Sequence, residues 1–223
     1  MQVDILTSNI NHPGLKGIKG YSRDSMEKNG LSLCIFDDVR KLRKHGILFL
    51  VSYQNKLNLI EYSEYTHIIV FHASDLPKGR GWSPYIWDIL SGADTITVCA
   101  ISAADEIDCG DIWAKTKFNV AKTDFLAEVL EQISLAQLNL LKEVVKMVIS
   151  GKYPIPQDLN IKPTYFSKRT PKDNHLNPEK TLNQLFDQIR MSDPKRFPAV
   201  VQIHGKKFKI LMESLDDEKY NNR

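Results

Sequence analysis

The chain contains 223 residues, of which 42% are hydrophobic, so it is long enough and apolar enough to fold around a substantial core. Its formal net charge of +3 is too small to indicate a nucleic-acid-binding protein, and no apolar run is long enough to span a membrane. No signal-peptide pattern opens the sequence, and Cys34, Cys99 and Cys109 lack metal-binding spacing. We therefore expect a cytoplasmic protein with reduced thiols and no bound metal.

Short apolar segments rich in β-branched residues predict strands at 2–7, 32–36, 47–52, 66–72, 95–101 and 111–120. The segments 47–52 and 66–72 are apolar throughout rather than alternating. That pattern is typical of strands covered on both faces, as in a parallel sheet. The sequence therefore predicts an α/β fold with a mostly parallel sheet.

Helices are expected between and after these strands. Ser83 followed by Pro84 is typical of an N-cap and a first helical residue, so a helix should begin at Pro84. The longest predicted helix covers 123–150, with Thr123 as its N-cap and an apolar stripe along one face. Gly151 should end it.

The last part of the chain differs in composition. Residues 154–178 are richer in proline, asparagine and lysine and are interpreted as a linker. A helix at 179–192 and a hairpin with strands at 199–203 and 206–211 should follow. The predicted division is a main α/β domain, 1–153, and a small C-terminal α+β subdomain, 154–223.

The segment VFHASDLPKGRGWSP begins at Val70 and places His72 at the end of a buried strand. Ligands of open α/β sheets bind beyond the carboxyl ends of the strands. Lys78 and Arg80 add positive charge to the loop that follows, and the helix start near Ser83 offers free backbone amides, so the loop suits an anion. Taken alone, however, a histidine at a strand end is more often structural.

A second segment, DEIDCGDI, places four carboxylates around Gly110, directly after an apolar strand. They belong to Asp105, Glu106, Asp108 and Asp111. Such an acidic loop is ordinarily a solvated turn. A carboxylate that reached the histidine at the neighbouring strand end would instead orient its ring for proton transfer near neutral pH.

Together the two segments resemble the formyltransferase superfamily, which includes glycinamide ribonucleotide, methionyl-tRNA and sugar N-formyltransferases. The family pattern is Asn-x-His-x-Ser-x-Leu-Pro-x-x-x-Gly, followed later by Asp-x-Gly-x-Ile. The chain matches it at His72, Ser74, Leu76, Pro77 and Gly81, and then at Asp108, Gly110 and Ile112. The resemblance is close over residues 40–120 and implies the Rossmann-like formyltransferase fold, with 1–153 as the catalytic domain.

The resemblance implies transfer of a formyl group from N10-formyltetrahydrofolate to an amine. His72 would stabilise the oxyanion that develops on the formyl oxygen, with weak support from Ser74, and Asp108 would hold the imidazole and move a proton. Val70 stands where the family has asparagine, so another group must replace that donor or the oxyanion is held with less help. The implied donor-binding residues are Leu50, Ser52, Tyr53, Gln54 and Asp105.

The C-terminal segments KRTPKD, QIR and FPAVVQIHGKKFKI resemble those of sugar N-formyltransferases. The implied acceptor is an amino sugar linked to UDP or dTDP, used in surface glycan biosynthesis, and the implied assembly is a homodimer formed through this region. The implied substrate contacts are Lys78, Arg80, Gly81, Trp82, Arg169 and Arg190. Alternatives are a methionyl-tRNA or purine-pathway formyltransferase, or a catalytically inactive homologue that binds folate or nucleotide.

Overall fold

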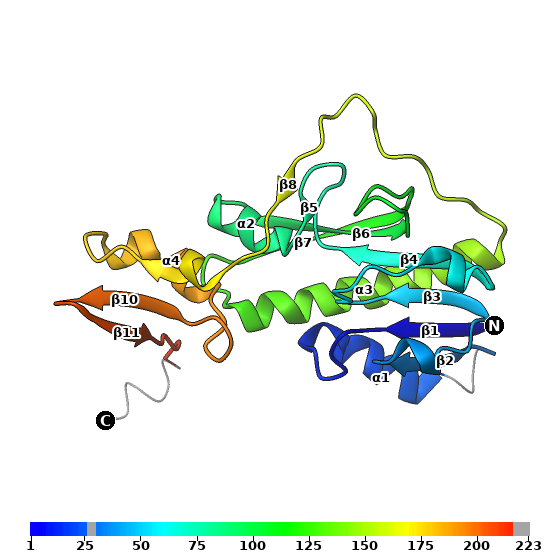
Figure 1. The fold of residues 1–223 in the computed structure, drawn as a ribbon, viewed down its shortest axis with the longest axis horizontal. Helices are drawn as coiled ribbons and strands as arrows, with labels where there is room; N and C mark the ends of the chain where they lie inside the picture. Colours follow the sequence, from blue (N-terminus) through cyan, green and yellow to red (C-terminus); the bar gives the residue numbers. More distant parts are fainter. Residues whose placement is uncertain (26–29, 216–223) are drawn as a thin grey trace.

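The computed structural model describes residues 1–25 and 30–215. Its main body is a six-stranded sheet in the order β2-β1-β3-β4-β6-β7 (Figure 1). These strands are β1 (Gln2–Leu6), β2 (Ser32–Phe36), β3 (Gly46–Leu50), β4 (Tyr65–His72), β6 (Thr95–Ser102) and β7 (Ile112–Asn119). The first four strands pair in parallel, and β6 and β7 add antiparallel pairs. The predicted α/β fold with a mostly parallel sheet is confirmed.

The main helices are α1 (Lys16–Ser25), α2 (Pro84–Leu90), α3 (Leu126–Ile149) and α4 (Leu182–Arg190). Short 3-10 helices lie at Pro13–Leu15, Val39–Lys41, Leu59–Tyr62 and Pro171–Asn174. The sequence did not predict α1, whose segment KGIKGYSRDS contains two glycines and little apolar surface. None of the helices in the described ranges is long and apolar enough to cross a membrane.

The sheet is buried on both faces, as the apolar run of β3 predicted. On one face Phe49 and Ile69 belong to the same core as Leu140 and Val144 of α3, the long helix that lies along the sheet (Figure 1). On the other face Leu48 packs in a second core, which the loops between the strands complete. All five residues of β3 are buried. Burial of this apolar area is the main contribution to the stability of the domain.

Of the two predicted helix caps, Ser83 is confirmed as the N-cap residue of α2, whereas Thr123 was wrong. Helix α3 begins at Leu126, and Glu128 accepts a hydrogen bond from the Phe125 amide at 3.0 Å in place of a cap by Thr123. The Asp124 carboxylate binds the Ala121 amide at 2.8 Å and so holds these residues in a turn before the helix. Ser83 does precede α2, but its left-handed backbone, with φ of 46°, leaves its side chain without a capping hydrogen bond.

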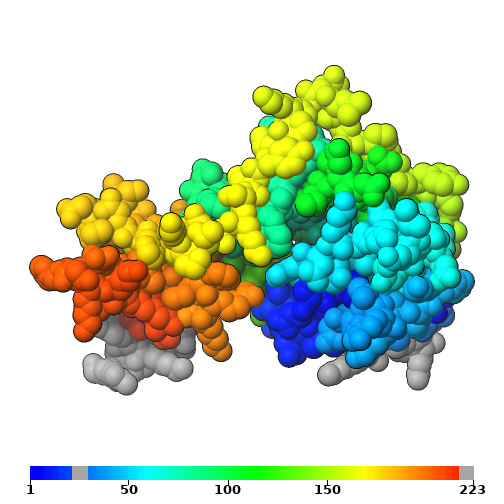
Figure 2. Space-filling view, in the orientation of Figure 1, coloured from blue at the N-terminus to red at the C-terminus, as the bar shows by residue number. Residues whose placement is uncertain are grey.

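The C-terminal residues form a small lobe beside the main body (Figure 2). Its sheet contains β9 (His175–Leu176), β10 (Ala199–Ile203) and β11 (Lys206–Ile210). Strands β10 and β11 form the predicted antiparallel hairpin, and Leu185 of α4 packs with Val201 in the core of the lobe.

The segment that leads to this lobe first crosses the main domain. Ile155 forms an antiparallel bridge with Ile112, and β8 (Tyr165–Phe166) pairs in parallel with β5 (Arg80–Gly81). In Figure 1 this segment arches above the sheet before it reaches the lobe. Residues interpreted as a linker therefore lie against the loop that follows His72.

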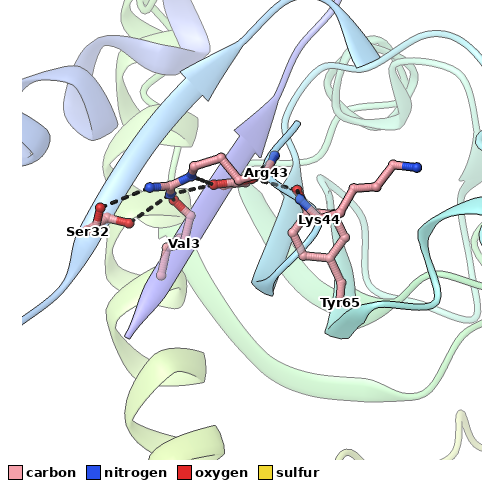
Figure 3. A network of polar contacts seen from close by, with 6 residues as sticks. Val3, Ser32, Arg43, Lys44 and Tyr65 are labelled. Atoms are coloured by element: carbon pink, nitrogen blue, oxygen red, sulfur yellow. Dashed lines mark hydrogen bonds and ion pairs between the residues drawn. The ribbon is translucent and has the colours of Figure 1, made fainter. Parts of the chain in front are cut away.

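A buried carboxylate ties the amino ends of several strands together. Asp4 is fully buried in β1, and its Oδ1 lies 2.7 Å from the Arg43 Nε, while the Tyr65 hydroxyl donates to its Oδ2 at 2.5 Å. Arg43 also donates to Ser32 and to the Val3 carbonyl (Figure 3). Burial and the bond to Asp4 raise the pKa of Tyr65, so it remains a donor. The network lies at the edge of the sheet opposite the strand ends that carry His72.

Candidate active site

The loops that follow β1, β3 and β4 meet at one edge of the sheet. The loop after β1 carries His12, the loop after β3 carries Ser52, and His72 is the last residue of β4. Because β1, β3 and β4 are parallel neighbours, their carboxyl ends lie at the same edge of the sheet. The His12 Nδ1 and the Ser52 Oγ are 3.2 Å apart. Two cavities open at this edge, and His72 lines both.

His72 and Asp108 form a close, buried pair. The imidazole Nδ1 lies 3.4 Å from the Asp108 Oδ1, and both side chains are less than a tenth exposed. The other nitrogen, Nε2, lies 2.8 Å from the Gly79 carbonyl oxygen. Since a carbonyl only accepts, Nε2 carries a hydrogen in this contact. The Asp108 carboxylate faces the other ring nitrogen, so the two contacts together fix the orientation of the imidazole.

The Asp108 loop is held from several sides. The Gly81 amide donates to the Asp108 Oδ2 at 2.8 Å. The Gln157 Nε2 donates to the carbonyls of Asp108 at 2.8 Å and Gly110 at 2.9 Å. A Cβ at Gly110 would overlap the Ser102 carbonyl oxygen, so only glycine fits there. The loop therefore folds back beside β4 and brings its carboxylate to the histidine.

Arg80 supports this loop from inside the protein. Its guanidinium donates to the Gln157 Oε1 at 2.7 Å, to the Tyr165 hydroxyl at 3.0 Å and to the Cys109 Sγ at 2.8 Å. The residue is buried and lines neither cavity at His72. Arg80 therefore has a structural role. It links the loop after β4 to the Asp108 loop and to the segment that crosses the main domain before the C-terminal lobe.

The first cavity extends from His72 along the ends of β3 and β6. Its polar wall contains Ser52, Tyr53, Gln54 and Asp108. Apolar side chains supply the rest, including Leu50, Leu57, Leu59, Val70, Ile101 and Ile107. Four of the five residues expected to bind the formyl donor line this cavity. The fifth, Asp105, is exposed and lies outside the lining.

The second cavity lies on the other side of His72. It shares Ser52, Gly81 and Trp82 with the first cavity, so the two meet at the histidine. Its far wall comes from α3, where Leu130, Ile133 and Gln137 lie on one helical face. The remaining wall includes His12, Gly14, Ala73, Pro84 and Tyr85. A ligand in either cavity can thus reach the same imidazole.

Several side chains from the expected substrate set lie away from these cavities. Lys78 lines a separate hollow with Asp75. Arg169 is half-buried and donates to Asn174. Arg190 is buried and donates to the carbonyls of Ala121 and Asp124, which joins α4 to the main domain.

Two other expected residues lie close to His72. Trp82 lines both cavities, and the Lys168 ammonium lies over its ring at 4.4 Å from the centroid. Ser74 is buried beneath Gly79, and its hydroxyl has no partner among the described residues. Ser74 lines neither cavity, so its hydroxyl is not directed at a ligand there.

Charged groups near the second cavity shift the pKa values of two of its residues, which the sequence did not predict. Burial lowers the pKa of His12, and the nearby Arg196 guanidinium lowers it further. Burial raises the pKa of Tyr85 to about 12, against the opposing effect of Arg169 and Arg196. Both rings are therefore neutral at neutral pH, and positive charge from the C-terminal lobe lies close to them.

Sequence reasoning missed His12, Gln137, Gln157 and Arg196. The segment NINHP directly follows the first strand, so His12 carried the same strand-end signal as His72. Gln137 interrupts an apolar helical face, which is a weaker signal. Nothing local marked Gln157 or Arg196. Within the described ranges, no group of three or more His, Cys, Asp or Glu side chains could hold a metal ion.

Comparison with known proteins adds to this geometry. No family model matches the chain. The curated methionyl-tRNA formyltransferase of Streptococcus sanguinis is 31% identical over 141 residues, which are 62% of this chain and 44% of that protein. The chain thus spans less than half the length of the curated relatives it matches.

Solved structures extend the likeness over nearly the whole chain. A methionyl-tRNA formyltransferase from Clostridium thermocellum superposes with a TM-score of 0.80 at 20% identity, covering 97% of this chain and 94% of that one. WlaRD, a sugar 3N-formyl transferase solved in the presence of dTDP and 5-N-formyl-THF, gives 0.62 at 19% identity over 85% of this chain and 78% of its own.

The fold and the site define an α/β protein whose sheet edge carries a histidine–carboxylate pair between two cavities. This is the formyltransferase fold. The chain has this fold, and 141 of its residues are similar in sequence to methionyl-tRNA formyltransferases.

Proposed function

We propose that the chain is an N-formyltransferase that moves a formyl group from N10-formyltetrahydrofolate to the amine of an amino sugar linked to dTDP or UDP. One observation carries the proposal: the buried pair of His72 and Asp108 lies where two cavities meet. A transfer between two ligands needs such an arrangement, because each must present its reacting atom to the same groups. The product would serve surface glycan biosynthesis.

The first cavity suits the formyl donor. Apolar side chains line much of it, as a flat heteroaromatic ring requires, and the strand-end segment from Leu50 to Gln54 supplies polar groups at its wall. Asp105 would contact the donor only from outside this lining. When bound, the donor supplies an activated formyl carbon.

The residues at the junction can perform the transfer without a covalent enzyme intermediate. The acceptor nitrogen forms a bond to the formyl carbon, and Asp108 takes the proton that this nitrogen loses. His72 would exchange the contact of its Nε2 with the Gly79 carbonyl for a hydrogen bond to the oxygen on which negative charge develops, an interaction that typically contributes about 2.7–4 kcal/mol. The proton then passes to the leaving nitrogen, which restores Asp108 to its starting state.

The second cavity suits the acceptor. Trp82 and Gly81 form the wall next to His72, and Arg169 and Arg196 place positive charge near its Tyr85. That positive charge would attract the negatively charged phosphates of a nucleoside diphosphate. The dTDP present with WlaRD supports a nucleotide-linked acceptor for a protein of this fold. Lys78, Arg80 and Arg190 lie elsewhere and would act only indirectly.

The C-terminal lobe suits self-association. Strand β11 lies at the edge of its sheet, so its outer backbone groups are free to pair with another strand. Ile203 and Phe208 are large exposed apolar side chains of the same hairpin. We therefore propose a homodimer formed through this lobe, and light scattering of the purified protein tests it.

A second candidate function is formylation of methionyl-tRNA. It is favoured by the 31% identity to the methionyl-tRNA formyltransferase of Streptococcus sanguinis. Titration at physiological salt separates the candidates, with 5-formyltetrahydrofolate, dTDP, UDP and initiator tRNA as ligands. The sugar-nucleotide proposal predicts saturable binding of folate and of dTDP or UDP, with weak, salt-dependent tRNA binding. Tight tRNA binding without any nucleotide binding contradicts it.

Two further alternatives make different predictions in the same titration. A purine-pathway enzyme would bind folate but neither dTDP nor UDP. An inactive homologue, suggested by Val70 in place of the family asparagine, would bind folate or nucleotide without turnover of the formyl donor. Titration therefore has to be accompanied by a measurement of donor consumption with an amino sugar nucleotide present.

A further inference from the structure

Gln137 is an unusual residue for its place in α3. Its neighbours on the inner face of the helix, Ile133, Leu140 and Leu141, are apolar and buried. Gln137 itself is only 5% exposed, and its Oε1 has no hydrogen-bond partner among the described residues. A buried carbonyl oxygen without a partner is destabilising, so its presence in a native protein calls for a functional explanation.

The free oxygen belongs to the wall of the second cavity. His12 lines the same cavity, and its Nδ1 accepts a hydrogen bond from the Gly14 amide at 3.1 Å. Since an amide nitrogen can only donate, Nδ1 carries no hydrogen, and the neutral ring must carry its hydrogen at Nε2. No partner for Nε2 is found in the part of the chain that the structure describes. Among the described residues that line the cavity, Gln137 thus has an unpaired acceptor and His12 an unpaired donor.

Gly14 lies between these two groups. A Cβ on Gly14 would lie 3.0 Å from the His12 Nδ1 and 3.6 Å from the Gln137 Oε1. The His12 ring and the Gln137 oxygen therefore lie beside the same small space, which glycine leaves open. Ser52 lines the same cavity, and its Oγ lies 3.2 Å from the His12 Nδ1.

A hydroxyl group fits this pair, because it donates one hydrogen bond and accepts others. We infer that His12 and Gln137 form a hydroxyl-recognition subsite, which selects an acceptor that carries a free hydroxyl beside the amine to be formylated. The inference rests on the proposed formyl transfer and narrows its acceptor class to a hydroxylated ring. A methionyl side chain, which ends in a thioether, cannot donate to the Gln137 oxygen.

The test uses two pairs of probes. Each pair consists of a dTDP-linked amino-6-deoxyglucose, with its amine at C3 or at C4, and the analogue that lacks a hydroxyl next to the amine. The variant is Gln137→Met, which keeps a similar length and removes the amide. Gln132→Met, on the same helix but outside the cavity lining, is the matched control.

For wild type and Gln132→Met, kcat/KM for one hydroxylated probe should exceed that for its deoxy analogue by about 10- to 100-fold. In Gln137→Met this ratio should fall to about 1, because the rate for the deoxy analogue is kept. The unliganded variant should be at least as stable to urea as wild type, because it no longer buries an unpaired oxygen. A purely structural glutamine would lose stability on substitution and leave the ratio unchanged, which would overturn the inference.

The experiment gives different results if the subsite is wrong and if the proposed formyl transfer is wrong. If no probe is formylated, calorimetric titration with the same probes still decides the subsite. Tighter binding of the hydroxylated member, lost in Gln137→Met, supports the subsite even though transfer has failed. Equal binding of both members, or no binding of either, overturns it. Formylation of both members of a pair at equal rates retains the proposed function and also overturns the subsite.

Discussion

The backbone amide of Gly81 donates a hydrogen bond to the Asp108 Oδ2 at 2.8 Å, while the other oxygen of the same carboxylate lies 3.4 Å from the His72 Nδ1. The loop after β4 therefore fixes the carboxylate that faces the histidine at the end of the same strand. One oxygen of Asp108 is anchored, and the other is left for the imidazole and for a reacting proton.

The paired roles of His72 and Asp108 predict the cost of removing either one. His72→Ala and Asp108→Asn should each lower the rate of formyl transfer by ~10²-fold or more, the usual scale for acid–base and oxyanion groups. Asp111→Asn, an exposed residue of the same loop, is the control and should leave the rate unchanged. Steady-state rates with folded, purified variants are the measurement. Near-normal turnover of both site variants would exclude the mechanism.

The close approach at Gly81 predicts a large effect of a small substitution. A Cβ there would overlap the Phe166 carbonyl oxygen, and the backbone has a φ of 97°. Gly81→Ala should therefore separate β5 from β8, release Asp108 and lower both activity and stability, with strain alone costing roughly 1–3 kcal/mol. Gly92→Ala is the matched control, because Gly92 has a similar φ of 95° but open space around it.

Urea denaturation of the two glycine variants separates their effects. The Gly92 variant should lose stability through backbone strain only and keep its activity. An equal loss of stability and full activity in both variants would show that the contact with Phe166 does not matter.

Val70 lines the first cavity where the superfamily pattern has an asparagine. If His72 already supplies the main oxyanion contact, Val70→Asn should give at most a modest gain in rate. It can also lose rate, because the new amide would lie beside apolar side chains such as Ile101 with no assured partner. Measurement of kcat for Val70→Asn distinguishes between these outcomes. A gain approaching ~10²-fold would show that the natural protein lacks an oxyanion donor.

The strands were predictable because their signal is local. The residues around Phe49 are all apolar because β3 is buried on both faces of the sheet. Each strand predicted for the main sheet corresponds to a strand in the structure. His72 was singled out for a similar reason, because it ends an apolar strand. The local pattern left four carboxylates around Gly110 as candidates, and only the resemblance to formyltransferases selected Asp108.

The contacts that hold the site residues in place were not predictable, because they join parts of the chain that are distant in the sequence. Arg80 read as an exposed cation in a glycine-containing loop, and nothing in its surroundings indicated that Gln157 and Tyr165 would bury it. His12 did follow a predicted strand, but its place beside Ser52 depends on the adjacency of β1 and β3 in the sheet.

The lowered pKa of His12 predicts a pH dependence of stability. Burial and Arg196 both lower this pKa below its usual 6.5, so the unfolded chain binds the proton more tightly than the folded one. The stabilising contribution is fully present above about pH 6.5 and is lost as the pH falls toward the folded-state pKa. His12→Asn, which keeps an acceptor for the Gly14 amide, should lose less stability than wild type between pH 7.5 and 5.5.

Urea denaturation at both pH values measures this difference. Arg196→Gln removes the second cause of the lowered pKa, so that variant should also lose less stability than wild type as the pH falls. The same loss of stability in wild type and in His12→Asn would contradict the assignment.

The central claim is that the junction of the two cavities formylates a nucleotide-linked amino sugar, and mass spectrometry of the acceptor tests it most directly. Purified protein would be incubated with N10-formyltetrahydrofolate and, separately, with dTDP- and UDP-linked amino sugars and with methionyl-tRNA. We predict that one amino sugar nucleotide gains the mass of a formyl group, that Asp108→Asn abolishes the gain, and that methionyl-tRNA is unchanged. Formylation of methionyl-tRNA alone, or an equal gain with Asp108→Asn, would contradict the account.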